Sequence, residues 1–234
     1  MPQKMTAQQF RLFEAPARAA WIAAAAQQLH GTYPAYFRAL RVEAQQLEPL
    51  CNAVADWAGE RGIVGERDVA QLCCVAVTLG HEFWRDPRFI DAVSETVGST
   101  DLTRTEATQL LMRETGDWLA GLWNNDSLSG FAERMGYHLR SNAGPAPQVL
   151  QSILPGHWVV RDAAFNAWLI DTISAALPSM HMPAQKLAVV GLSLVHGTGW
   201  MRDPQYGWIA QVVLTAPSPD ALTSAVSAFY SEIA

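Results

Sequence analysis

Residues 80–89 read GHEFWRDPRF, and residues 197–206 read GTGWMRDPQY. We call these stretches the first corner and the second corner. Each begins with glycine after an apolar run, continues through an aromatic residue to Arg-Asp-Pro, and ends on a second aromatic residue. The two Asp-Pro pairs lie 117 positions apart in a chain of 234 residues. The repetition has two interpretations, a catalytic signature used twice or the remnant of a duplicated scaffold.

A purely structural role accounts for every repeated residue. An aspartate before proline can accept hydrogen bonds from the free amides of a first helical turn, where proline loses nothing by lacking a donor. Glycine is the least strained residue where the preceding helix must stop. The sequence therefore predicts six structural caps: Gly80, Asp86, Pro87, Gly197, Asp203 and Pro204.

The rest of the chain favours the helical period of 3.6 residues and shows no strand-like alternation. In the first half we expect helices at 16–30, 34–47, 49–60, 66–79, 87–97 and 103–123. In the second half we expect them at 127–141, 147–154, 162–176, 183–196, 204–214 and 219–233. The stretches 142–148 (NAGPAPQ) and 154–160 (LPGHWVV) are the longer expected loops.

Adding 117 to each expected helix of the first half gives a position near a helix of the second half, in order. The predicted fold is therefore an all-α, multi-helix domain made of two related six-helix halves, in a pseudo-twofold or short-solenoid arrangement. The halves are residues 1–123 and 124–234, expected to pack as one globular unit.

Composition limits the classes of partner and compartment. The net charge is −6 and no run of basic residues occurs, so nucleic acids and anionic membrane surfaces are disfavoured. No apolar stretch approaches the ~20 residues of a spanning helix, and the N-terminus lacks the pattern of a secretory peptide, so we expect a cytoplasmic protein. The cysteines, Cys51, Cys73 and Cys74, are expected to be buried small side chains rather than a disulfide framework.

A catalytic interpretation of the corners is the alternative. His81 with Asp86, and His196 with Asp203, could line a pocket in an enzyme or a small-molecule-binding helical domain. Against this, His81 corresponds to Thr198 and not to a histidine in the second corner, and no nucleotide-binding, nucleophile-elbow or metalloprotease motif occurs. We expect no catalytic residue, no metal and no cofactor, and the balance is against an enzyme.

The aromatic and arginine residues near helix ends point to a protein partner, although filling of the core is their commoner use. The candidate partner-binding residues are Trp84, Arg85, Phe89, Trp200, Arg202, Tyr206 and Trp208. We therefore expect a non-enzymatic adaptor, chaperone, immunity or accessory protein that binds another polypeptide or forms a homo-oligomer. Two lysines and abundant alanine suggest a bacterial chain from GC-rich DNA, where such proteins serve secretion or toxin systems.

Overall fold

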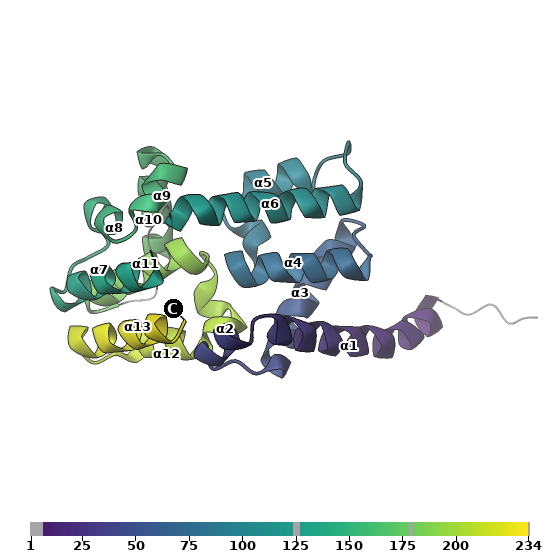
Figure 1. Ribbon diagram of the computed structural model, residues 1–234, viewed down its shortest axis with the longest axis horizontal. Coiled ribbons are helices and arrows are strands. Elements are labelled where there is room, and N and C mark those ends of the chain that lie inside the picture. Colours follow the sequence, from purple (N-terminus) through teal and green to yellow (C-terminus); the bar gives the residue numbers. More distant parts are fainter. Residues whose placement is uncertain (1–6, 124–126, 178–179, 234) are drawn as a thin grey trace, which may run out of the picture.

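The computed structural model describes residues 7–123, 127–177 and 180–233, and within these residues it contains 13 α-helices and no strand (Figure 1). This confirms the all-α class. Up to residue 123 the elements are α1 (Ala7–Thr32), α2 (Pro34–Ala39), η1 (Ala44–Leu47), α3 (Glu48–Glu60), α4 (Glu66–Leu79), η2 (Phe83–Arg85), α5 (Ile90–Thr96) and α6 (Arg104–Trp123). From residue 127 they are α7 (Leu128–Arg140), α8 (Pro147–Ile153), α9 (Pro155–Val160), α10 (Ala163–Ala176), α11 (Pro183–His196), η3 (Trp200–Arg202), η4 (Pro204–Tyr206), α12 (Gly207–Thr215) and α13 (Pro219–Ile233), where η denotes a 3₁₀ turn.

Four expected helices differ from the observed ones by three residues or more. The helix expected at 16–30 already begins at Ala7, so Pro16 lies inside α1 rather than in its first turn. The helix expected at 34–47 is divided, because Arg41 adopts a positive φ of 58° and the chain turns there before η1. The helices expected at 87–97 and 204–214 begin only at Ile90 and Gly207, since the residues after each proline form a tighter turn first. Aspartate and proline therefore open a turn rather than the α-helix itself.

The prediction of a loop at 154–160 is also wrong. These residues form the short helix α9, in which Pro155 occupies the first turn. The close approach of Gly156 to α6 explains the glycine, because a Cβ there would lie 1.8 Å from the carbonyl oxygen of Leu122. The Pro-Gly pair thus begins a helix and lets it pack closely on α6.

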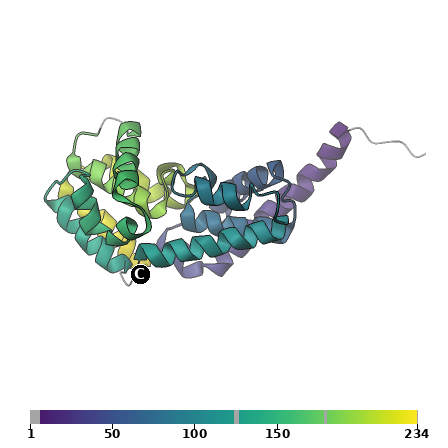
Figure 2. The same cartoon turned by 90° about the horizontal axis from the view of Figure 1, so that it is seen from above.

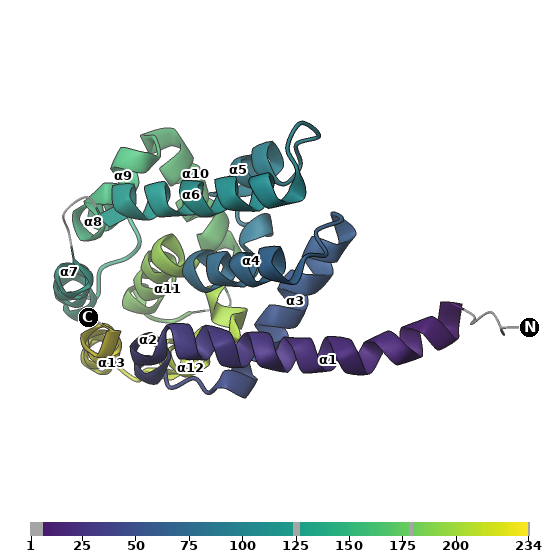
Figure 3. The same cartoon turned by 45° about the vertical axis from the view of Figure 1, so that its right-hand side comes forward.

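The core lies around α11, which Figures 1 and 3 show among the other helices. Twelve of its fourteen residues are buried, as expected for a helix that is apolar on nearly all sides. The buried apolar cluster runs through both parts of the chain, from Ile22 in α1 to Tyr230 in α13. Around this core α13 packs on α7, and α6 packs on both α9 and α4.

One end of α1 extends away from the rest of the chain (Figures 2 and 3). The side chains of residues 15–20 are exposed, whereas Ile22 and Leu29 are buried against the body. None of the helices described combines the length and apolar character needed to traverse a lipid bilayer. Residues 124–126, where we expected the junction between the halves, lie outside the described residues, so the domain boundary stays a prediction.

Candidate functional site

The two corners follow α4 and α11, helices of 14 residues each. Gly80 ends α4 with φ 102° and ψ 149°, and Gly197 ends α11 with φ 104° and ψ 149°. A three-residue 3₁₀ turn follows in both cases, and then Asp86 and Asp203, whose φ of −74° is the same. Only glycine adopts these positive-φ conformations without strain, so each glycine fixes the direction in which its corner leaves the helix.

The aspartate of each corner binds the loop of the other. Asp86 Oδ2 accepts hydrogen bonds from the backbone nitrogen of Thr198 at 2.7 Å and from its hydroxyl at 3.2 Å. Asp203 Oδ2 accepts a hydrogen bond from the backbone nitrogen of His81 at 2.9 Å. Both carboxylates are buried, with Asp86 3% and Asp203 1% exposed. Each carboxylate therefore satisfies an amide just past the helix end of the opposite corner.

The partners within each corner differ in charge. Asp86 holds the buried guanidinium of Arg88 through Nε and Nη2, both at 2.9 Å, and Arg88 Nη1 donates to the Leu194 carbonyl at 2.7 Å. Asp203 instead accepts from the backbone and side-chain nitrogens of Gln205, at 3.0 and 3.2 Å. The first corner thus contains a buried ion pair, and the second holds its carboxylate with neutral donors.

The environment of Asp86 keeps it ionised. Burial raises the pKa of its carboxyl group. The Arg88 charge and the hydrogen bonds from Arg88 and Thr198 lower this pKa by more than burial raises it, so the net pKa lies below its usual value. Loss of this carboxylate would leave the Arg88 guanidinium buried without its counter-charge.

The histidines that sequence analysis placed at the corners have different surroundings. His81 Nδ1 lies 3.7 Å from Asp203 Oδ2. His196 is buried, and its Nε2 lies 2.8 Å from the hydroxyl of Tyr230. Burial, aided by the Arg88 charge, lowers the pKa of His196 to about 3, so the ring is neutral near pH 7 and a weak base. This geometry favours a structural role for His196 over proton transfer.

A third histidine lies near the corners, and the sequence favours a packing or surface role for it over that of a ligand. His157 in α9 is fully buried, and both of its ring nitrogens lack a hydrogen-bond partner among the described residues. Burial, together with the positive charge of Arg88, lowers its pKa to about 3. No spacing in the sequence indicates this position, because α9 was itself expected to be a loop.

Three of the candidate partner-binding residues are corrected by their burial. Phe89, Trp200 and Tyr206 are 4%, 0% and 0% exposed, and their rings fill the core beneath the corners. Trp200 Nε1 donates to the Ser193 hydroxyl at 3.1 Å, which fixes the indole inside the protein. Side chains this deeply buried do not reach a partner on the surface.

The other four candidates remain accessible. Arg85 and Arg202 have exposed side-chain fractions of 74% and 79%, and Trp84 and Trp208 are half-buried. The Arg41 guanidinium lies 4.5 Å from the centre of the Trp208 ring. Trp208 lies in α12, outside the two corners, and the accessible candidates within the corners are Trp84, Arg85 and Arg202.

Two further residues, Glu82 and Arg61, complete the accessible surface, and neither was among the expected partner-binding residues. Glu82 lies 2.9 Å from Arg85 and 3.6 Å from Arg202, and so joins the two corners. Trp57 of α3 stacks on Trp84 with 4.9 Å between ring centres, and Arg61 lies 4.7 Å above the Trp57 ring. Trp57 itself is 4% exposed and supports this surface from within the core. We call the accessible residues the Arg–Trp strip: Arg61, Trp84, Glu82, Arg85 and Arg202. Its members come from the end of α3 and from both corners, and no local spacing predicts their convergence.

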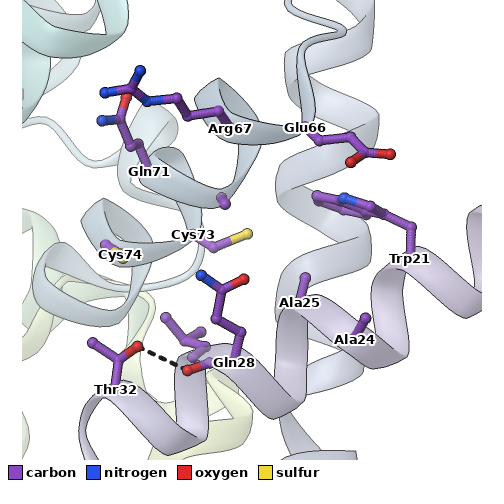
Figure 4. A pocket seen from close by; sticks show the side chains of 12 residues that line it. Trp21, Ala24, Ala25, Gln28, Thr32, Glu66, Arg67, Gln71, Cys73 and Cys74 are labelled. Carbon is purple, nitrogen blue, oxygen red and sulfur yellow. Dashed lines mark hydrogen bonds between the residues drawn. The ribbon is translucent and has the colours of Figure 1, made fainter.

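A pocket of about 490 Å³ lies between α1 and α4, away from the corners (Figure 4). Trp21 and Gln28 of α1 face Cys73 of α4 across it, and the side chains of Gln71 and Arg67 lie beside one another at its edge. Cys51 and Cys73 are buried, as the sequence predicts, Cys74 is half-buried, and all three are free thiols. Within the described residues no group of three or more His, Cys, Asp or Glu side chains could hold a metal ion.

Comparisons of this chain with protein families, with curated proteins and with solved structures found no match.

Proposed function

We propose that this chain is a non-enzymatic protein-binding protein that contacts its partner through the Arg–Trp strip. The observation that carries the proposal is the convergence of Arg85 and Arg202, one from each corner, on the single carboxylate of Glu82. Arginine and tryptophan are the residue types most enriched among the side chains that dominate binding energy at protein interfaces.

We expect the two exposed arginines of the strip, Arg85 and Arg202, to contribute little to folding, which favours a role in binding. Exposed ion pairs stabilise proteins by about 0–1 kcal/mol, because water and salt screen them and the long side chains lose entropy. The Arg85 and Arg202 side chains are mostly exposed, in contrast to the buried Arg88 only a few residues away. An adaptor, chaperone, immunity or accessory role is consistent with a surface of this kind.

We also infer that the two halves of the chain descend from a duplicated six-helix unit. The reciprocal bonds between Asp86 and Thr198, and between Asp203 and His81, support this inference. Asp203 lies 117 positions after Asp86, and His81 lies 117 positions before Thr198, so the two bonds join equivalent positions of the two halves. Aligned relatives would test it. Relatives that retain the glycine and Asp-Pro of one corner while losing those of the other would contradict the duplication.

The partner proposal is tested by purification from the native host. Wild-type protein should elute with a companion of defined size, and the double variant Arg85→Glu/Arg202→Glu should lose it. Arg113→Glu is the matched control, because Arg113 is an exposed arginine on α6 outside the strip. A wild-type protein that elutes alone at every salt concentration, as judged by light scattering, would contradict the proposal. A companion that the double variant retains would place the interface elsewhere.

A further inference from the structure

A second pocket, of about 270 Å³, lies where the ends of α4, α6 and α11 meet α2 and the start of α7. Val77, Leu119, Leu122 and Val195 contribute apolar side chains, and none of the ten lining residues in the described part of the chain is Asp, Glu, Lys or Arg. Pockets between the helices of a bundle are a common location for ligand sites, and this volume lies just below the usual range for drug-sized ligands. Size and lining together favour one small, uncharged occupant.

Two polar groups of the lining are already satisfied within the protein. The hydroxyl of Tyr36 lies 3.0 Å from the hydroxyl of Tyr206, and the Thr78 hydroxyl donates to the Cys74 carbonyl at 3.0 Å. These groups therefore gain little from an occupant.

Tyr33 and Trp123 also carry polar atoms, but they are exposed and half-buried, so the buried polar group that remains is the imidazole of His196. Its side chain lines the pocket and the residue is 7% exposed, with Nε2 engaged by Tyr230. Among the described residues Nδ1 has no hydrogen-bond partner, and unlike the ring nitrogens of His157 it is not sealed from solvent. The ring is neutral near pH 7, so Nδ1 carries a proton or accepts one according to the direction of the Tyr230 bond. A hydroxyl group suits either tautomer, because it both donates and accepts.

We propose that this pocket binds one small uncharged alcohol or phenol, whose hydroxyl group bonds Nδ1 of His196 while its apolar body fills the space between α4, α6 and α11. The site shares no residue with the Arg–Trp strip, so it is independent of the proposed protein-binding function. An apolar side chain from a protein partner would fill the same space but would leave Nδ1 unpaired.

Three probes that share a methylbenzene framework test the proposal: p-cresol, toluene and p-toluate. Trp123 lines the pocket, so its fluorescence and isothermal titration report occupancy. We expect saturable one-to-one binding of p-cresol, about tenfold weaker binding of toluene because one hydrogen bond is lost, and no saturable binding of the anion. Absence of saturable p-cresol binding, or equal binding of p-toluate, would overturn the proposal.

Two variants locate the site. Leu119→Trp fills the pocket from the half-buried wall of α6 and should weaken p-cresol binding by about tenfold or more. Leu214→Trp is the matched control, since Leu214 is 43% exposed on α12, and it should leave the affinity unchanged. An unchanged affinity in Leu119→Trp would show that p-cresol binds elsewhere, which overturns the proposal.

His196→Phe tests the hydrogen bond, because phenylalanine preserves the ring stacking on Tyr230 without Nδ1. The preference for p-cresol over toluene should disappear in this variant, and a preference that persists would contradict the role of Nδ1. If the variant does not fold, the ratio of p-cresol to toluene affinity in wild-type protein and the Leu119→Trp result decide the question.

Discussion

Gly80 and Gly197 are buried against one another: a Cβ on Gly80 would lie 3.6 Å from the Cα of Gly197, and a Cβ on Gly197 would lie 3.5 Å from the Cα of Gly80. The same Cβ atoms would lie 2.8 Å from the His196 carbonyl oxygen and 2.6 Å from that of Leu79. The two helix ends therefore meet through their backbones. The reciprocal aspartate bonds on either side of this contact hold the two corners together.

Substitution of either glycine should be strongly destabilising. In Gly80→Ala and Gly197→Ala, the positive φ alone costs about 1–3 kcal/mol, and the contact with backbone atoms adds to it. Gly116→Ala is the control, because open space surrounds this helical glycine, and it should be neutral or stabilising by about 0.5–1 kcal/mol. Urea unfolding measures the free energy of unfolding of all three variants. Equal free energies of unfolding for Gly80→Ala and Gly116→Ala would contradict the close approach.

The two aspartates should differ in their contribution to stability. Asp86→Asn removes the counter-charge of buried Arg88 and should lower the free energy of unfolding by about 3–5 kcal/mol. Asp203→Asn disturbs bonds from neutral donors only and should cost about 1–3 kcal/mol. The double variant Asp86→Asn/Arg88→Gln should recover part of the loss, since it removes the unpaired charge. A larger loss in Asp203→Asn than in Asp86→Asn would contradict this account.

Stability should fall in mild acid. The folded-state pKa values of His157 and His196 are about 3, below the value near 6.5 of an unfolded histidine, so the unfolded state binds more protons between these limits. The contribution of the two neutral histidines to the free energy of unfolding is therefore fully present above about pH 6.5. It decreases as the pH falls toward about 3, by up to about 1.4 kcal/mol per pH unit for each histidine.

Urea midpoints measured between about pH 8 and pH 4 test this dependence. His157→Gln should reduce the slope, because one of the two buried histidines no longer titrates on unfolding. A stability that stays constant from about pH 7 to pH 5 would contradict the burial of both neutral rings.

The exposed arginines of the corners should be dispensable for folding. Arg85→Ala and Arg202→Ala should each change the free energy of unfolding by less than about 1 kcal/mol, since water screens both pairs with Glu82. Arg88→Ala, which removes a buried partner of Asp86, provides the contrast and should cost several times more. A loss in Arg202→Ala as large as that in Arg88→Ala would assign the strip to folding rather than binding.

The sequence predicts the parts of this fold that depend on local signals. The bounds of α4 and α11 match the expectation because glycine ends each apolar run with a conformation that other residues avoid. The end of α2 was missed because Arg41 adopts a positive φ without any glycine to indicate it. Local propensity also misassigned Pro155 and Gly156, whose helix depends on packing against α6.

Only part of the candidate site was predictable: the sequence identifies Trp84, Arg85 and Arg202, but not Glu82, Arg61 or the geometry of the corners. The corner residues are identified by their repetition, whereas the bond from Thr198 to Asp86 joins positions 112 apart and no local pattern encodes it. The burial of Trp200 and Tyr206 likewise depends on how α11, α12 and α13 close over them. Glu82 acquires its role only because both corners face it.

Amide hydrogen exchange at His81 and Thr198 tests most directly whether each corner is held by the aspartate of the other. In Asp203→Ala the His81 amide, 122 residues away, should exchange faster relative to the remaining core amides, while the Thr198 amide keeps its protection. In Asp86→Ala the pattern should be reversed. If each substitution instead releases only amides of its own corner, the two corners do not stabilise one another and the account is wrong.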